Sequence, residues 1–121
     1  MNEVNPRKKE LALLVPLLNT RARDVERLAV SLGGAKSREF TDSQKNLGVD
    51  KESWFLASSS ERDYVIVYVE GKDVMKSLND LIGSDTRFDL WIKTQVAGLT
   101  GIDWNNPTNL VLPRQILRYG Y

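Results

Sequence analysis

Apolar residues recur along the chain with two periods, one typical of strands and one typical of helices. Continuous or alternating apolar runs predict four strands, over Glu10–Leu18, Glu52–Ser58, Arg62–Gly71 and Leu110–Tyr119. The polar segment Ser59–Glu61 lies between the second and third strands and is short enough for a hairpin. The regions between the other strands are longer and carry the helical period.

The first helical region follows the first predicted strand. Its apolar positions at helical spacing are Val25, Leu28, Ala29 and Leu32. Asn19–Thr20 offers good N-cap side chains before them, and Gly33–Gly34 should break the helix. A second helical segment is predicted over Ala35–Leu47, with Asp42 as its latest start. Gly48 suits the C-terminal end of that segment.

The second helical region follows the third strand. Its apolar positions are Val74, Met75, Leu78, Leu81 and Ile82, followed by Phe88, Trp91, Ile92, Val96 and Leu99. Asp73 can cap the first segment, and Gly83–Ser84 should interrupt the helix. Thr86 and Asp89 have the spacing of a capping box, and Gly101 is suited to end the second segment.

The order of the predicted elements, β-α-β-β-α-β, is that of the ferredoxin-like fold. The sequence therefore predicts an α+β domain with a four-stranded antiparallel sheet and helices on one face. Strands one and three should occupy the centre of this sheet, which agrees with their apolar composition. Pro16 and Pro113 fit such strands poorly, because proline cannot donate a ladder hydrogen bond. Residues 1–9 are expected to be a loose lead-in, and residues 10–121 a single domain.

Both faces of the third strand are apolar. One face carries Val65, Val67 and Val69, and the other carries Tyr64, Ile66 and Tyr68. Helices should cover the valine face, which leaves the tyrosine face in need of a cover, because burying one aliphatic side chain contributes about 1.5–3 kcal/mol. A second copy of the chain, a single-stranded nucleic acid or an unrelated protein could supply it.

The sequence argues against a nucleic acid as the cover of the tyrosine face. RNA-recognition motifs place a basic residue and spaced aromatics on the third strand, and Arg62 and Tyr64 fit only part of that pattern. Asp63 and Ile66 stand where glycine and an aromatic residue are required. The net charge of +1 also lacks the basic footprint of such binders, so a homodimer through sheet faces is the preferred reading.

The composition restricts the chemistry. The 121 residues include neither cysteine nor histidine, which excludes zinc sites, proximal-histidine haem ligation and Ser-His-type triads within this chain. No carboxylate cluster has metal-ligand spacing, so neither a metal nor a cofactor is expected. The short basic run Arg7–Lys9 is interpreted as a solvated tail. No apolar run reaches the length of a membrane span, and a cytoplasmic protein is expected.

Scattered positions resemble the dimeric α+β-barrel superfamily of ferredoxin-like domains, in a small, little-characterised bacterial branch. These positions are Arg38, Phe40, Leu47–Gly48, Trp54, Val67–Gly71, Phe88, Asp89, Trp91 and Gly101–Asp103. The resemblance spans about residues 10–104. It implies a homodimer whose two sheets face each other, with a cavity between helices and sheet or within the barrel. Members of the superfamily include cofactor-free monooxygenases and isomerases as well as stress-related proteins.

Six residues are candidates for a pocket: Arg38, Trp54, Tyr64, Tyr68, Glu70 and Trp91. Tyr68 and Glu70 share one strand face, where a phenol and a carboxylate could meet, and Arg38 could serve as a counter-ion. Each residue also has a simpler interpretation, as core for the aromatic side chains and as solvated surface for the charged ones.

The function predicted from these patterns is the binding of a small apolar or aromatic ligand, or a stress-related role, without established catalysis. A cofactor-independent monooxygenase or isomerase is the first alternative. A protein-interaction module that uses the sheet face is the second.

Overall fold

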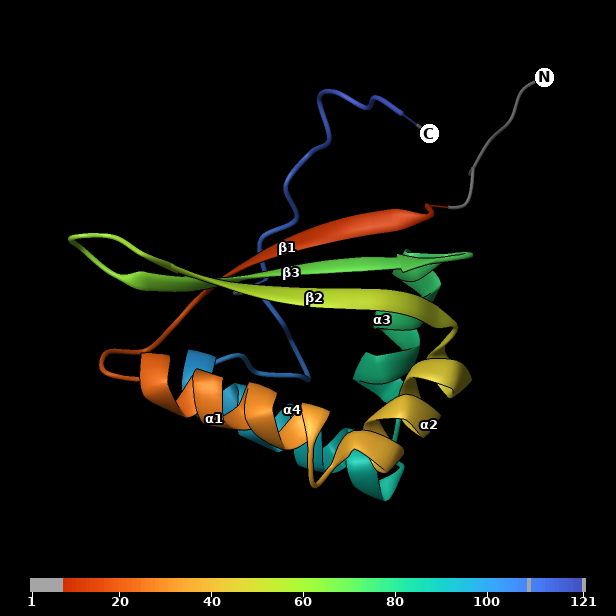
Figure 1. The fold of residues 1–121 in the computed structure, drawn as a ribbon, viewed down its shortest axis with the longest axis horizontal. Coiled ribbons are helices and arrows are strands. Elements are labelled where there is room, and N and C mark those ends of the chain that lie inside the picture. Colours follow the sequence, from red (N-terminus) through yellow and green to blue (C-terminus); the bar gives the residue numbers. More distant parts are fainter. Residues whose placement is uncertain (1–7, 109, 121) are drawn as a thin grey trace.

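The computed structural model describes residues 8–108 and 110–120. This part of the chain forms a three-stranded antiparallel sheet with helices packed on one side (Figure 1). The elements are β1 Glu10–Pro16, α1 Ala22–Gly33, α2 Ser37–Leu47, β2 Val49–Ser58, β3 Asp63–Gly71, α3 Val74–Gly83 and α4 Arg87–Thr100. The predicted α+β, ferredoxin-like arrangement is therefore confirmed in outline, with one strand fewer than expected.

The sheet has the order β1-β3-β2, so β3 is central and β1 lies at an edge. The register pairs Leu14 with Ile66 and Ile66 with Phe55 across the three strands. The prediction that strands one and three are both central is right for β3 and wrong for β1, because no full strand of the described residues pairs with the outer edge of β1. Pro16 is accommodated at the last position of β1, where no further ladder bond is needed.

The predicted fourth strand does not form. Within the described residues 110–120, one bridge joins the C-terminal segment to β1, between Leu14 and Val111, with N–O distances of 3.0 and 3.3 Å. The bridge lies where a fourth ferredoxin-like strand would run. Pro113 follows two residues later, on the same ladder phase as Val111, and has no N–H with which to extend the pairing. Residues 112–120 then leave the edge of β1 as extended coil.

The breaks and caps of the helices follow local sequence signals in most places. α1 ends at Gly33, Gly48 closes α2 with a left-handed φ of 77°, and Asp73 accepts a hydrogen bond from the first turn of α3. The expected N-cap at Asn19–Thr20 is wrong, because α1 begins one residue later, after Arg21, without a side-chain cap. α2 starts at Ser37, within the predicted limits.

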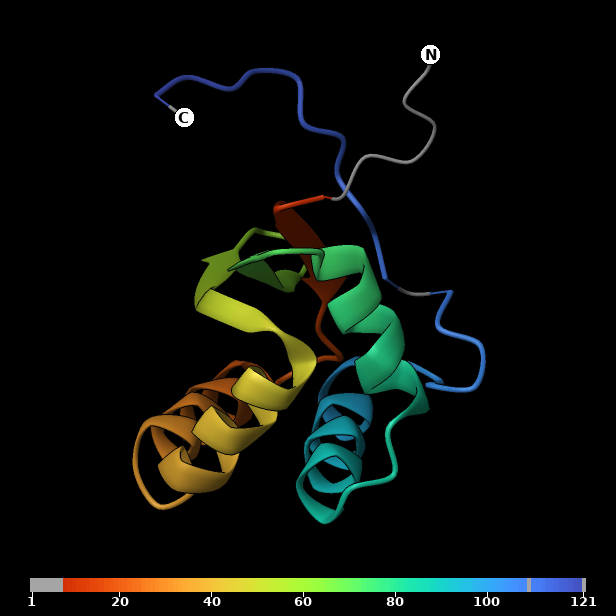
Figure 2. The same ribbon diagram turned by 90° about the vertical axis from the view of Figure 1, so that its right-hand side faces the viewer.

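The helices cover only one face of the sheet (Figures 1 and 2). Val65 and Val69 are buried beneath them and Val67 is half-buried, as expected for the valine face of β3. On β1, the same face buries Leu11, Leu13 and Val15, and Leu17 is buried directly after the strand. Tyr64, Ile66 and Tyr68 point to the open side and are half-buried.

Candidate functional site

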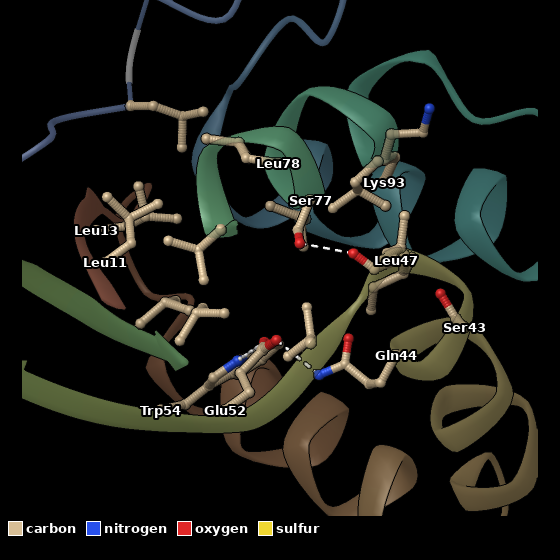
Figure 3. A pocket seen from close by; sticks show the side chains of 18 of the residues that line it. Leu11, Leu13, Ser43, Gln44, Leu47, Glu52, Trp54, Ser77, Leu78 and Lys93 are labelled. Carbon is tan, nitrogen blue, oxygen red and sulfur yellow. Dashed lines mark hydrogen bonds between the residues drawn. The ribbon is translucent and has the colours of Figure 1, made fainter. Parts of the chain in front are cut away.

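A cavity of about 140 Å³ lies between the covered face of the sheet and the helices (Figure 3). Strand side chains form its floor and helix side chains its walls, since strand residues two apart share a face. The apolar lining includes Leu11, Leu13, Val67 and Val69 from the sheet, Val74 and Leu78 from α3, and Ile92 and Val96 from α4. The position and lining agree with one of the two cavity locations that the resemblance implied.

One carboxylate lies at this apolar cavity. Glu52 and Trp54 are two residues apart on β2 and therefore share its helix-facing side. The indole Nε1 of Trp54 donates to Glu52 Oε2 at 2.7 Å, and Gln44 Nε2 of α2 donates to Oε1 at 2.8 Å. Figure 3 shows these three side chains converging at one end of the cavity. The two donors fix the carboxylate while leaving each oxygen a second lone pair for a donor on a ligand.

A separate polar cluster surrounds Asp89 at the start of α4. Asp89 is only 3% exposed, and its carboxylate accepts from Ser43 Oγ at 2.5 Å and from Ser84 Oγ at 2.6 Å. The backbone N–H of Asp89 donates to Thr86 Oγ1, so half of the predicted capping box forms. The carboxylate bridges α2 and the α3–α4 turn instead of completing the box. We assign this cluster a role in holding the helices together.

Lys93 is buried at the cavity wall without facing its centre. Its Nζ donates to the carbonyl oxygens of Ile82, at 2.9 Å, and Ser84, at 2.7 Å. These carbonyls belong to the C-terminal end of α3, where a cation is favourable. In Figure 3 the amino group points away from the cavity. Lys93 thus secures the α3–α4 turn, and Glu52 is the charged side chain directed toward the cavity.

The six residues predicted for a pocket do not come together in one site. Trp54 lines the cavity. Tyr64, Tyr68 and Glu70 lie on the other face of the sheet, where the hydroxyl of Tyr68 is 2.8 Å from Glu70 Oε2 and 3.1 Å from Glu10 Oε2.

The two remaining candidates lie on the helices. Arg38 is exposed on α2 and is separated from Glu70 by the sheet. Trp91 is half-buried on α4, packs against Phe88 at a ring distance of 5.7 Å, and lies beneath Lys36 Nζ at 4.8 Å. These contacts place Trp91 in an aromatic and cationic cluster between α2 and α4.

Sequence reasoning missed Glu52 and Gln44. The available signal was the Glu52-x-Trp54 spacing, which puts a carboxylate and an indole on one strand face. Nothing in the sequence alone indicated that this face is the covered one. In the described residues, no group of three acidic side chains is arranged to hold a metal ion. No helix within that same part of the chain has the length and apolar character needed to span a membrane.

Comparisons with known proteins add information on the fold. No family model and no curated protein matches the chain. Among solved structures, the chain is similar to L-rhamnose mutarotase FA22100 from Formosa agariphila, with a TM-score of 0.68. The match covers 93% of this chain and 100% of the mutarotase chain at 14% sequence identity. The likeness is one of fold.

Proposed function

We propose that the protein binds a small apolar molecule, about the size of one aromatic ring, in the cavity between sheet and helices. The observation that carries this proposal is a cavity of about 140 Å³ with a mostly apolar lining between the sheet and the helices. Engineered apolar cavities of about 150 Å³ admit benzene. A ligand much larger than a single ring would require the helices to move.

Glu52 favours a ligand that carries one hydrogen-bond donor. The carboxylate is held by Trp54 and Gln44, so its oxygens have a fixed position at the cavity. A phenolic hydroxyl directed at Glu52 would keep its hydrogen bond on leaving water, whereas its ring would contact the apolar lining. Phenol and toluene have similar sizes and are therefore suitable probes of this contact.

An isomerase is the second candidate, because of the fold that the chain shares with a sugar mutarotase. A sugar carries hydroxyl groups around its ring, and each needs a partner when it is buried. The cavity offers few, since Gln44 and Ser77 already donate to protein oxygens at 2.8 and 2.6 Å. We therefore place the apolar ligand first. The experiment is to follow the exchange of L-rhamnose anomers by proton NMR with and without the protein. If the protein accelerates this exchange, the isomerase becomes the first candidate.

Filling the cavity should abolish ligand binding. In the Val67→Phe variant the added ring enters the cavity from the central strand, so heat from titration with phenol or toluene should disappear. The matched control is Leu90→Phe, which adds a ring at an exposed position of α4 outside the cavity and should bind as the unmodified protein does. Calorimetric titration of folded protein provides the measurement. Equal binding by Val67→Phe would place the ligand elsewhere.

Replacing Glu52 with glutamine should separate the two probes. Hydrogen bonds to charged groups contribute about 1.5–3 kcal/mol, so phenol affinity should fall roughly tenfold or more. Toluene makes no hydrogen bond and should bind Glu52→Gln within twofold of its original affinity. A parallel loss for both probes would show that Glu52 shapes the cavity without contacting the ligand.

We also propose that a second copy of the chain covers the open face of the sheet, giving a homodimer. This face carries Leu14 and Ile66 in register with Phe55, which is 56% exposed. Such a row of apolar side chains is typical of an interface. The helices cover the opposite face, so the ligand cavity and the proposed dimer contact lie on different sides of the sheet.

A further inference from the structure

The C-terminal segment 112–120 exposes large apolar side chains to solvent. It leaves the edge of β1 after the bridge at Val111 and runs on the open side of the sheet in both views of the fold (Figures 1 and 2). Ile116, Leu117 and Tyr119 are 84%, 81% and 92% exposed. Single exposed apolar side chains are common on monomers, but three large ones within four residues form a contiguous apolar surface. Such a surface indicates an interaction site.

The segment does not cover its own sheet. A groove of about 580 Å³ separates Pro113, Arg114 and Gln115 from Ala12 and Tyr68 on the open face. Polar contacts to Glu10 hold the segment at one point, with Gln115 Nε2 at 2.5 Å and Arg118 Nε at 3.8 Å from Glu10 Oε1. Ile116 and Leu117 lie between these two contacts and Tyr119 follows them, and all three side chains are exposed and do not pack on their own domain.

The open face alone is small for a stable dimer. Four side chains from each of three strands make twelve in all. The three strands lie about 4.8 Å apart, so the sheet is about 15 Å wide. A stable interface takes about 20–30 residues from each partner. The nine residues 112–120 bring the total close to that number, and fully extended they span about 30 Å, twice the width of the sheet.

We propose that residues 112–120 form an arm that packs on the open sheet face of a second copy of this chain. Two-fold symmetry then places one arm on each sheet, so the contact is reciprocal and closed. Ile116, Leu117 and Tyr119 meet the row of Leu14, Ile66 and Phe55 of the other copy. The inference rests on the proposed homodimer and adds the segment that completes it.

The absence of cysteine permits a direct test with the full chain. A Tyr119→Cys variant carrying a nitroxide label is mixed with ¹⁵N-labelled protein of unchanged sequence, after light scattering has established the dimer. The expected result is line broadening of ¹⁵N amides in Ser53–Ala57 and Tyr64–Tyr68, because the label then belongs to another chain. A dimer without this broadening overturns the arm and leaves the dimer intact. A monomer at micromolar concentration overturns both.

Complementation gives an independent readout. The Ile116→Lys/Leu117→Lys variant has a defective arm and an intact face, and Phe55→Lys has the reverse. Each variant should dimerise at least tenfold more weakly than the original chain, and their mixture should recover a heterodimer with one intact arm-on-face contact. The added charge is positive in both, so charge attraction cannot cause recovery. The control Val30→Lys, at an exposed site on α1, should leave dimerisation unchanged. No recovery in the mixture would contradict exchange of arms between copies.

Discussion

The Asp89→Ala variant is expected to lose about 3–4 kcal/mol of unfolding free energy, through a combination of two effects. The substitution removes a nearly inaccessible carboxylate that accepts hydrogen bonds from Ser43 and Ser84. The Ser43 hydroxyl loses its acceptor, the Ser84 hydroxyl keeps only the long contact to Thr86 Oγ1 at 3.5 Å, and a small void remains among α2, α4 and the turn between α3 and α4. Because these elements form the cavity walls, the proposed binding of phenol should weaken as well.

Urea denaturation followed by circular dichroism measures this loss. The matched control is Asp80→Ala, which removes an exposed carboxylate that pairs with Lys76 at 2.6 Å and should cost less than about 1 kcal/mol. Asp89→Asn should fall between the two, since the amide retains one acceptor for a hydroxyl. Equal midpoints for Asp89→Ala and Asp80→Ala would show that the cluster does not hold the helices together.

Replacing Gly71 with alanine should lower the free energy of unfolding by about 2–3 kcal/mol, which is the upper part of the range for substitutions that overpack a site. A β-carbon at Gly71 would lie 2.4 Å from the carbonyl oxygen of Gly48, far inside van der Waals contact. That oxygen belongs to the backbone at the junction of α2 and β2, so no side-chain rotation relieves the clash. Separation of β2 from β3 at the Val49 pair is the available response.

Gly98→Ala serves as the matched control for Gly71→Ala. A β-carbon at Gly98 meets no atom within 4 Å, and the residue lies inside α4. Alanine should therefore stabilise the protein by about 0.5–1 kcal/mol, because glycine is the poorer helix former. The midpoints of thermal and urea denaturation should fall for Gly71→Ala and rise for Gly98→Ala. A raised midpoint for Gly71→Ala as well would mean that the close approach between Gly71 and Gly48 can relax.

Local signals predicted the helix boundaries well. Asp73 and Thr86 each accept a hydrogen bond from the third residue beyond them, and Gly48 and Gly101 adopt left-handed φ values of 77°. Each feature involves residues within one turn of the helix end, so its energetics are contained in a short stretch of sequence. Asn19–Thr20 failed as a cap although its residue types were suitable. Thr20 has a left-handed φ of 64° and its hydroxyl donates to the carbonyl oxygen of Asn19, so it does not cap α1, which begins at Ala22.

Pairing of distant segments was less predictable. Leu110–Tyr119 has the composition of a strand, yet forms only the bridge at Val111. A strand needs a partner edge and backbone N–H groups that can donate to it. Pro113 has no N–H, so the pairing that begins at Val111 cannot continue at the next donor position. The apolar character of the segment remained correct, and the structure shows it exposed on the open side of the sheet.

By itself, the sequence determined the identity and order of the other elements, the two apolar faces of β3, and the exclusion of histidine and cysteine chemistry. These depend on periodicity and composition, which are local properties of the chain. Only the tertiary structure decided that Glu52 meets Gln44 and Trp54, and that the cavity they border lies between the sheet and the helices, on the side away from Tyr68 and Glu70. The physical reason is that a strand pattern distinguishes two faces, whereas packing of the helices selects which face encloses a site.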